Sequence, residues 1–269
     1  SGTIFFINNL AYSSGTWTMR GFLSIVRLLI GTALYTANFT PPTTALTSVA
    51  NTKFLISGTN AGIYDNSMNN SMEVFNAQID TSIKKYGTGS IYYYNTTSSY
   101  ASMINRGQFD FGTGDFTVEA WVYPITLVST KGSIVGGLGA TNGDWVFAIN
   151  TTTTLSWGRT QIAWDLSTSG VTFTTGTWYH VAACRSAGTL RIFVDGVVRA
   201  SAASSQAYNI TSTVAIGARQ LTSGVFGPGL YWNGRISNLR IVGGVGLYTS
   251  NFTPTQGILT AVSGTSLLT

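Results

Sequence analysis

The chain is poor in the residues from which most enzyme sites are built. Of its 269 residues only 9% are charged, one is cysteine, one is histidine and two are glutamate. The lone Cys184 excludes an intrachain disulfide, and its apolar neighbours predict a small buried side chain. The lone His180 lies in no cluster that resembles a zinc site or a nucleophile with its base, and we expect it to pack structurally. These shortages argue against metal-dependent hydrolysis and against nucleophilic catalysis.

Glycoside hydrolysis is the enzymatic chemistry that two glutamates could still serve. A retaining mechanism needs two carboxylates about 5–5.5 Å apart. On one face of a strand such residues stand two or four positions apart. The chain offers Glu73 and Glu119, and the positions that share a strand face with Glu119 are Trp121 and Tyr123. The carboxylate pair is missing, so we predict that the chain is not an enzyme.

The positive charge is spread thinly. The net charge is +5, and among 14 basic residues only Lys84 and Lys85 are adjacent. A nucleic-acid-binding protein concentrates its basic residues in a patch or stripe. The apolar stretch 22–30 is too short to span a bilayer and contains Arg27. We therefore expect no nucleic-acid partner and no membrane insertion, and no signal peptide is visible.

Threonine, serine, glycine and asparagine take the place of charged residues, and 13% of the residues are aromatic. Residues 116–123 alternate apolar and polar side chains, which is typical of a strand with one buried face. Residues 190–199 form a predicted hairpin around the turn Asp195-Gly196. Further strands are expected at 145–149, 178–184, 214–216 and 236–242. Short strands between Gly- and Ser-rich turns predict an all-β, two-sheet antiparallel sandwich.

The two ends of the chain repeat each other. Residues 21–55 align without gaps to residues 234–268 at an offset of 213 and are identical at 16 of 35 positions. The chain is then either a window of a tandem array or a protein that uses one closing motif twice. We expect residues 1–55 to be the C-terminal portion of a preceding repeat or N-terminal connector strands. Residues 56–269 are expected to form the complete sandwich.

Six sequence blocks of the C-terminal region occur in the order of a known family. They are Asp65–Asn70, Lys85–Tyr94, Phe116–Pro124, Gly176–Val181, Val194–Gly196 and Gly234–Arg240. Together they resemble the concanavalin A-like lectin/glucanase superfamily, in its laminin-G-like or pentraxin-like branch. Residues 247–254 resemble the tail of a subtype found in tail-fibre and other virion proteins of bacteriophages. The resemblance implies a jelly-roll sandwich, an adhesive or structural role and, in some members, bound calcium.

Two kinds of binding site follow from this resemblance. Asp65 and Asn66 lie where the family often places calcium ligands, and calcium prefers carboxylate and carbonyl oxygens; a plain Asx turn is the alternative. Sugar binding in such folds uses exposed aromatic rings beside acids and amides, and the alternative for each candidate is a core or inter-subunit contact. The candidates are Trp145, Asp144, Trp157, Trp164, Asp165 and Trp232.

The leading hypothesis is a non-catalytic surface protein of a virion or of the extracellular space, with a glycan-binding adhesion module. Its partners would be cell-surface carbohydrate, other copies of itself or neighbouring virion proteins. The alternative is a purely structural subunit that assembles into a fibre, shell or array, in which residues 1–55 add strands to a neighbour.

Overall fold

A computed structural model divides the chain into two compact units, Ser1–Asn60 and Ala61–Thr269, and each is described by itself. The predicted boundary between residues 55 and 56 stays a prediction. The structure describes residues 9–12, 15–18, 25–29, 31–43, 49, 52–57, 72–94, 99–127, 132–139, 143–211, 213–220 and 228–269. Within these residues, no helix has the length and apolar character needed to cross a membrane.

The described residues of the N-terminal unit include two hairpins. The first pairs β1 (Asn9–Tyr12) with β2 (Gly15–Thr18), and the second pairs β3 (Ile25–Leu29) with β4 (Thr52–Ser57). Both pairings are antiparallel. A two-stranded hairpin is marginally stable alone in water, so each of these elements needs a surface to pack against.

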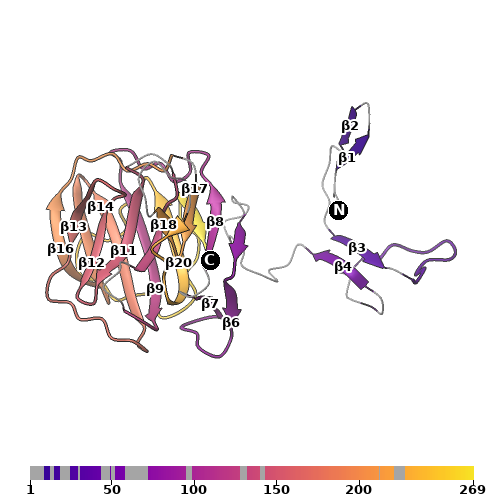
Figure 1. Ribbon diagram of the computed structural model, residues 1–269, viewed down its shortest axis with the longest axis horizontal. Helices are drawn as coiled ribbons and strands as arrows, with labels where there is room; N and C mark the ends of the chain where they lie inside the picture. The colour runs from indigo at the N-terminus through magenta and orange to yellow at the C-terminus, as the bar shows by residue number, and fades with distance from the viewer. Residues whose placement is uncertain are drawn as a thin grey trace. The chain divides into compact units, whose positions relative to one another are not determined.

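The second unit is a sandwich of two antiparallel sheets, which confirms the predicted all-β fold (Figure 1). The seven-stranded sheet has the order β13-β12-β11-β10-β17-β8-β5. Its strands are β5 (Glu73–Phe75), β8 (Tyr100–Ile104), β10 (Gly132–Gly137), β11 (Trp145–Thr151), β12 (Thr154–Arg159), β13 (Ala163–Ser167) and β17 (Thr213–Ile216). A short ribbon of β18 (Arg219–Gln220) and β19 (Pro228–Gly229) follows β17.

The second sheet has eight strands in the order β16-β15-β14-β9-β20-β7-β6, and β21 also pairs with β20. They are β6 (Gln78–Asp80), β7 (Ser90–Tyr93), β9 (Phe116–Pro124), β14 (Tyr179–Ser186), β15 (Thr189–Val194), β16 (Val197–Ala203), β20 (Gly234–Gly243) and β21 (Thr265–Leu268). Asp195 and Gly196 have φ values of 52° and 76° and form the predicted hairpin turn between β15 and β16. A Cβ on Gly196 would lie 1.9 Å from the carbonyl oxygen of Phe252, so glycine is also required for close packing.

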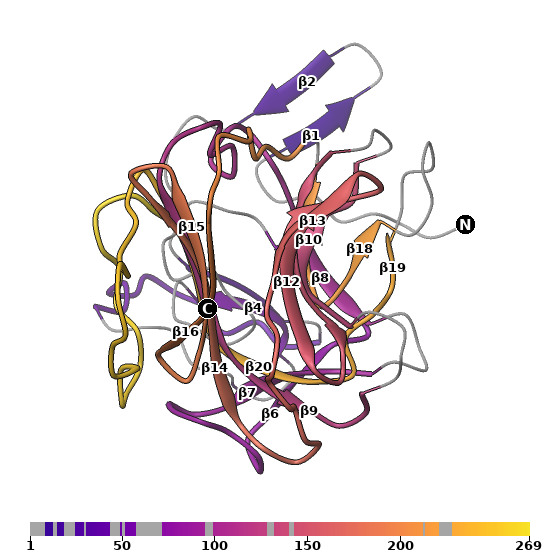
Figure 2. The same ribbon diagram turned by 90° about the vertical axis from the view of Figure 1, so that its left-hand side faces the viewer.

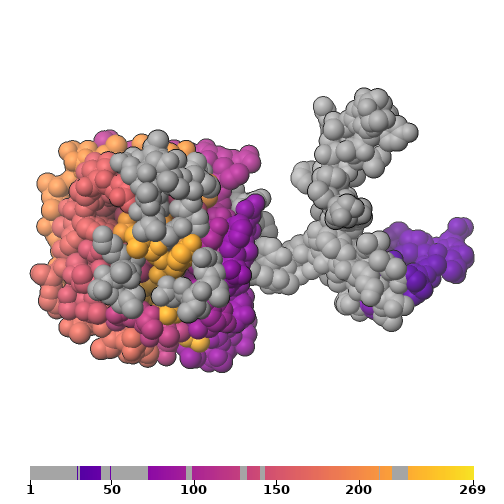
Figure 3. Space-filling view, viewed as in Figure 1, coloured from indigo at the N-terminus to yellow at the C-terminus, as the bar shows by residue number. Residues whose placement is uncertain are grey.

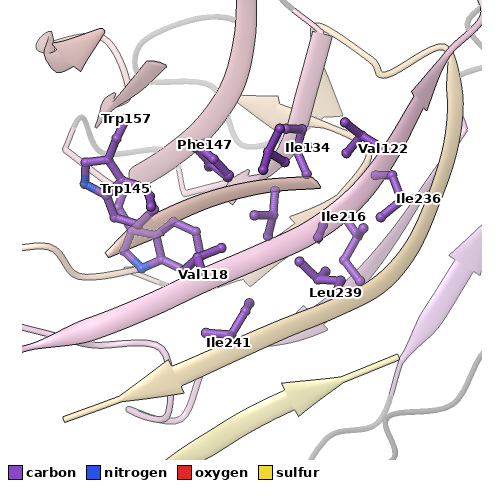
Figure 4. Close-up of a cluster of buried hydrophobic side chains, with 14 of the residues drawn as sticks. Val118, Val122, Ile134, Trp145, Phe147, Trp157, Ile216, Ile236, Leu239 and Ile241 are labelled. Atoms are coloured by element: carbon purple, nitrogen blue, oxygen red, sulfur yellow. The ribbon is translucent and has the colours of Figure 1, made fainter. Parts of the chain in front are cut away.

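The core fills the space between the sheets. Alternate residues of each strand point inward, and aromatic rings gather where β9 faces β11 and β12 (Figure 4). The labelled core side chains are Val118, Val122, Ile134, Trp145, Phe147, Trp157, Ile216, Ile236, Leu239 and Ile241. One contiguous core of this size is what holds the two sheets together without a disulfide.

The outer face of β9 is buried as well as the inner one. The alternation predicts one dry face and one face of aromatic and polar residues, and on this second face Thr117 and Glu119 are both 0% exposed. Residues 244–264, here called the closing strap, connect β20 to β21 and run over this side of the eight-stranded sheet (the yellow segment in Figure 2). The period of a strand reports which residues share a face, and it does not report whether another segment covers that face.

An aromatic pair fixes the closing strap to the sheet. Tyr248 and Phe252 are stacked with ring centroids 3.7 Å apart, and Phe252 lies 5.3 Å from the ring of Phe193. The backbone N–H of Tyr248 donates to Sγ of Cys184 at 3.4 Å. Cys184 is therefore buried, as predicted, and burial raises the pKa of its thiol.

A buried polar network lies under the same strap. The carboxylate of Glu119 interacts with Nε2 of His180 at 3.0 Å, and it accepts hydrogen bonds from Nε of Arg240 at 2.8 Å and the hydroxyl of Tyr248 at 2.9 Å. Burial acts to raise the pKa of Glu119, but the hydrogen bond from His180 and the charge of Arg240 outweigh it and hold that pKa below its ordinary value. Glu119 thus joins three strands and the strap in one charged cluster.

A second ion pair ties the edge of the sheet to its centre. Asp80 of β6 accepts hydrogen bonds from the hydroxyl and backbone N–H of Ser82 and pairs with Arg235 of β20 at 2.6 Å. The Ser82 hydrogen bond lowers the pKa of Asp80 most, burial opposes it, and Arg235 adds to it, so that the pKa lies well below its ordinary value.

This depressed pKa predicts acid sensitivity. The Asp80 contribution to stability is fully present above the unfolded pKa of about 3.9 and is lost as the pH falls toward the lower folded pKa. We expect Asp80→Asn to flatten the fall of the unfolding free energy between neutral pH and about pH 3, measured by urea denaturation. Glu73→Gln on the exposed strand β5 is the matched control. An unchanged slope in Asp80→Asn would contradict this assignment.

Candidate functional site

Three of the four tryptophans predicted to bind sugar belong to the interior, which corrects that prediction. Trp145 and Trp157 are 0% exposed and Trp232 is 1% exposed. Trp145 opens β11 and Trp157 lies in β12, and both point inward, where Nε1 of Trp145 donates to the carbonyl of Phe109 at 2.8 Å. A buried indole has no face on which a sugar can stack, so these residues stabilise the fold.

The predicted acids have structural partners. Asp144 is 0% exposed, and its carboxylate accepts the backbone N–H groups of Gly139 at 2.9 Å and Thr211 at 2.8 Å. The prediction that Asp144 contacts sugar is therefore wrong, because this buried carboxylate joins two loops. Asp165 accepts Nε and Nη2 of Arg159 at 2.9 and 2.8 Å, and this pair is partly exposed beside Trp164.

The predicted calcium ligands Asp65 and Asn66 lie outside the described residues. Among the residues that the structure describes, no group of three or more His, Cys, Asp or Glu side chains could hold a metal ion. The calcium site therefore stays a prediction.

The outer face of the seven-stranded sheet carries a row of small side chains in register. Ala215 of β17 lies opposite Ser102 of β8 and Gly136 of β10, and Val146 of β11 lies opposite Gly136 and Gly158 of β12. We call these five residues the floor. Cross-strand partners share a face of the sheet, and all five residues of the floor are buried, with Val146 at 1% and Ala215 at 0% exposure. Their strand neighbours point into the core: Met103, Ile216, Trp145, Phe147 and Trp157.

Trp164 stands at one end of the floor. It lies opposite Gly158, at a register shift between β12 and β13, and its side chain is partly exposed. A Cβ on Gly158 would lie 2.2 Å from the carbonyl oxygen of Ala163, so this close approach of the strands requires glycine. Of the four candidate tryptophans, Trp164 is the one whose ring reaches solvent on this face.

Arg219 lies against Trp164. Its guanidinium carbon is 5.2 Å from the centroid of the Trp164 ring, within the range of a cation–π contact. The side chain is 5% exposed, and its Nε has no hydrogen-bond acceptor among the described residues. Burial lowers the pKa of Arg219 to about 10, which still leaves the side chain charged at neutral pH. A buried guanidinium whose Nε has no acceptor in the described part of the chain favours an anionic or hydroxyl-rich ligand.

Tyrosines stand at the other end of the floor. Tyr100 and Tyr231 pack against the cluster of Leu138, Ala215 and Ala218. Their ring centroids are 6.4 Å apart, and Phe75 stacks on Tyr100 at 4.5 Å. Figure 3 shows this face of the sandwich toward the viewer. Aromatic rings and a cation on one face are suited to a flat, polar ligand that stacks and accepts hydrogen bonds.

Sequence reasoning finds one end of this site and misses the rest. Trp164 and Asp165 are adjacent to each other in the sequence and were recognisable as an aromatic residue beside an acid. Arg219, Tyr231 and the floor carry no local signal, because they come from separate strands and loops that only the sheet order brings together.

Glu119, the one glutamate in the interior, lies on the opposite side of the sandwich. It belongs to the eight-stranded sheet and is enclosed by His180, Arg240 and Tyr248 under the closing strap. Glu73, the other glutamate, lies on strand β5 of the seven-stranded sheet. The two glutamates are therefore placed on different sheets and do not form a pair on one strand face.

A search of curated proteins gave no match. The chain is similar in structure to the binding domain of Paraclostridial Mosquitocidal Protein 1, with 13% identity, a TM-score of 0.48, and coverage of 69% of this chain and 45% of the other. It is also similar to the binding domain of botulinum neurotoxin serotype G, with 14% identity, a TM-score of 0.48, and coverage of 72% and 46%. The chain thus spans less than half the length of each.

A third similar structure is domain 4 of AbnA, a GH43 extracellular arabinanase from Geobacillus stearothermophilus, in complex with arabinotriose. It shares 16% identity and a TM-score of 0.48, with coverage of 73% of this chain and 91% of that domain. The model of the concanavalin A-like lectin/glucanases superfamily matches residues 95–245, more than half of the 269 residues. The chain therefore belongs to the concanavalin A-like lectin/glucanases superfamily.

Proposed function

We propose that the sandwich is a non-catalytic carbohydrate-binding module whose ligand lies on the outer face of the seven-stranded sheet. The observation that carries this proposal is the contact of Arg219 with Trp164 beside the floor. The indole stacks on a sugar face, and the guanidinium donates to hydroxyl or carboxylate oxygens. Trp164 lies opposite Gly158 of the floor, and the partly exposed Arg159–Asp165 pair adds polar groups at the same edge.

The absence of catalysis is part of the proposal. A retaining glycosidase needs two carboxylates about 5–5.5 Å apart. Asp165, the carboxylate nearest Trp164 in sequence, instead accepts hydrogen bonds from Nε and Nη2 of Arg159.

We also propose that the module belongs to a surface protein of a virion or of the extracellular space. The low charge and the hydroxyl-rich composition support that placement.

Glycan binding tests the site directly. We expect the full chain to bind immobilised glycans on an array, and Trp164→Ala and Arg219→Gln each to weaken the affinity for the best ligand by at least about tenfold. Trp164→Ala should keep the thermal midpoint close to that of the wild type, because that residue is partly exposed.

Trp178→Ala is the matched control, since this partly exposed ring packs on Tyr123 of the other sheet at 5.3 Å and should not affect binding. Equal binding by wild type and Trp164→Ala would rule out this face. Release of sugar from a bound glycan by the wild-type chain would instead establish an enzyme.

A further inference from the structure

The N-terminal unit contains a hairpin with the register of the hairpin that closes the sandwich. Three consecutive cross-strand residue pairs of one hairpin correspond to three consecutive pairs of the other. In both hairpins the register shifts between the second and the third of these pairs. In the sandwich the pairs are Arg240 with Leu268, Ile241 with Leu267 and Val242 with Thr265. In the N-terminal unit they are Arg27 with Leu55, Leu28 with Phe54 and Leu29 with Thr52, each 213 positions earlier.

The aromatic pair of the closing strap is repeated as well. Tyr35 and Phe39 are stacked with centroids 3.7 Å apart and an interplanar angle of 8°. Tyr248 and Phe252 have the same separation and an angle of 3°. The two segments therefore adopt the same local structure as well as a similar sequence.

The two aromatic pairs differ in what they contact. In the sandwich, Phe252 packs on Phe193 and His180, and the hydroxyl of Tyr248 donates to Glu119. In the N-terminal unit, Tyr35 and Phe39 are 45% and 51% exposed. Leu34, beside this pair in the sequence, is also exposed at 42%. Exposed apolar area of this kind marks a docking surface, because its contact with water is unfavourable.

Four of the residues that the repeat retains contact the sandwich core. Arg240 and Tyr248 bind Glu119 of β9, Oδ1 of Asn251 accepts the backbone N–H of Val198 at 2.8 Å, and Phe252 packs on Phe193. These contacts join the closing hairpin to other strands, and they come in addition to contacts inside the hairpin, such as the hydrogen bond from Nη1 of Arg240 to the carbonyl of Thr260 at 2.9 Å. Their counterparts, at the same offset, are Arg27, Tyr35, Asn38 and Phe39, all identical.

We propose that residues 25–57 are the closing hairpin of a second sandwich core of the same family, one that lacks closing strands of its own. The partner is defined by chemistry: it carries a buried carboxylate at the position of Glu119 and apolar side chains at the positions of Cys184 and Phe193. The core in residues 72–233 is not this partner, because β20, the strap and β21 fill its position. Strand addition of this kind joins sandwiches in a row, and the glycan-binding face stays on the opposite sheet.

A hairpin graft in the full chain tests whether the N-terminal hairpin can close a sandwich core. Residues 238–269 are replaced by a second copy of residues 25–56, which puts the Tyr35–Phe39 pair over Cys184. We expect this chimera to unfold cooperatively and to protect Cys184, the lone cysteine, from a thiol reagent as the wild type does. Tyr35→Ser with Phe39→Ser in the grafted copy should speed modification of Cys184 by at least about tenfold, as Tyr248→Ser with Phe252→Ser should in the wild type.

A smaller graft keeps the proposal testable if the first graft does not fold. Residues 31–43 replace residues 244–256, so that β20 and β21 are untouched and the strap position alone is tested. If Cys184 in a folded smaller graft reacts as fast as in Tyr248→Ser with Phe252→Ser, the proposal is overturned. Failure of both grafts to fold overturns it too, because an equivalent closing element must complete the core.

The state of assembly of the wild type separates this partner from a second copy. Light scattering should give the mass of a monomer, since every copy of the core already has a closing hairpin. A dimer that Tyr35→Ser with Phe39→Ser dissociates would mean that the N-terminal hairpin closes another copy by exchange, which overturns the assignment to a core without closing strands.

Discussion

We expect Glu119→Gln to lower the free energy of unfolding by about 3–5 kcal/mol, the typical cost of removing one partner of a buried ion pair. Glu119 is 0% exposed and Arg240 is 6% exposed, so the substitution leaves a guanidinium in the interior without its counter-charge. The substitution also removes the negative charge of the carboxylate that His180 and Tyr248 contact. Urea denaturation at neutral pH measures the loss.

A second substitution separates the lost charge from lost packing. We expect Glu119→Gln combined with Arg240→Met to be more stable than Glu119→Gln alone, because no unpaired charge then remains in the interior. Glu73→Gln on the exposed edge strand should change stability by less than about 0.5 kcal/mol. A Glu119→Gln protein as stable as the wild type would show that the network does not hold the strap to the sheet.

Trp157→Ala should lower the free energy of unfolding by a similar amount, about 3–5 kcal/mol, because it removes the largest ring from the centre of the core. Trp157 is 0% exposed and stacks on Phe116 at 4.6 Å and Trp145 at 5.2 Å, and Tyr208 meets it edge-on at 5.4 Å. The cavity would separate rings that come from both sheets. Guanidinium denaturation gives the change in midpoint and in unfolding free energy.

Two variants show whether the loss comes from the missing ring. Trp157→Phe keeps an aromatic ring and gives up no hydrogen bond, because Nε1 of Trp157 has no acceptor in the described part of the chain. It should cost clearly less than Trp157→Ala. Trp164→Ala should have the opposite profile, with stability nearly unchanged and glycan binding reduced. A Trp157→Ala protein that is stable but loses glycan binding would reverse the two assignments.

The sequence predicts the fold well because the signals for strands are local. The alternation in residues 116–123 marks an inward face, and Asp195-Gly196 provides the positive φ values of a tight turn. The gapless repeat of residues 21–55 at 234–268 likewise appears in the structure as two hairpins with one register. Each of these features depends on residues close together in the chain or on direct comparison of two segments.

The candidate site was harder to predict because exposure is decided by the sheet as a whole. Trp145, Trp157 and Trp164 all lie near polar residues in the sequence, yet the first two point into the core and the third points out. Their direction depends on strand register and on a register shift at Gly158, which no single segment determines.

The sequence by itself determined that the chain is an all-β sandwich, that Cys184 is buried, and that one closing motif occurs twice. Only the tertiary structure decided that Glu119 lies under a strap, that Arg219 meets Trp164, and that one Tyr–Phe pair is packed while its copy is exposed. The physical reason is the range of the interactions. Strand period and turn conformation are local backbone properties, whereas burial and ion pairing depend on which distant segments the sheets bring together.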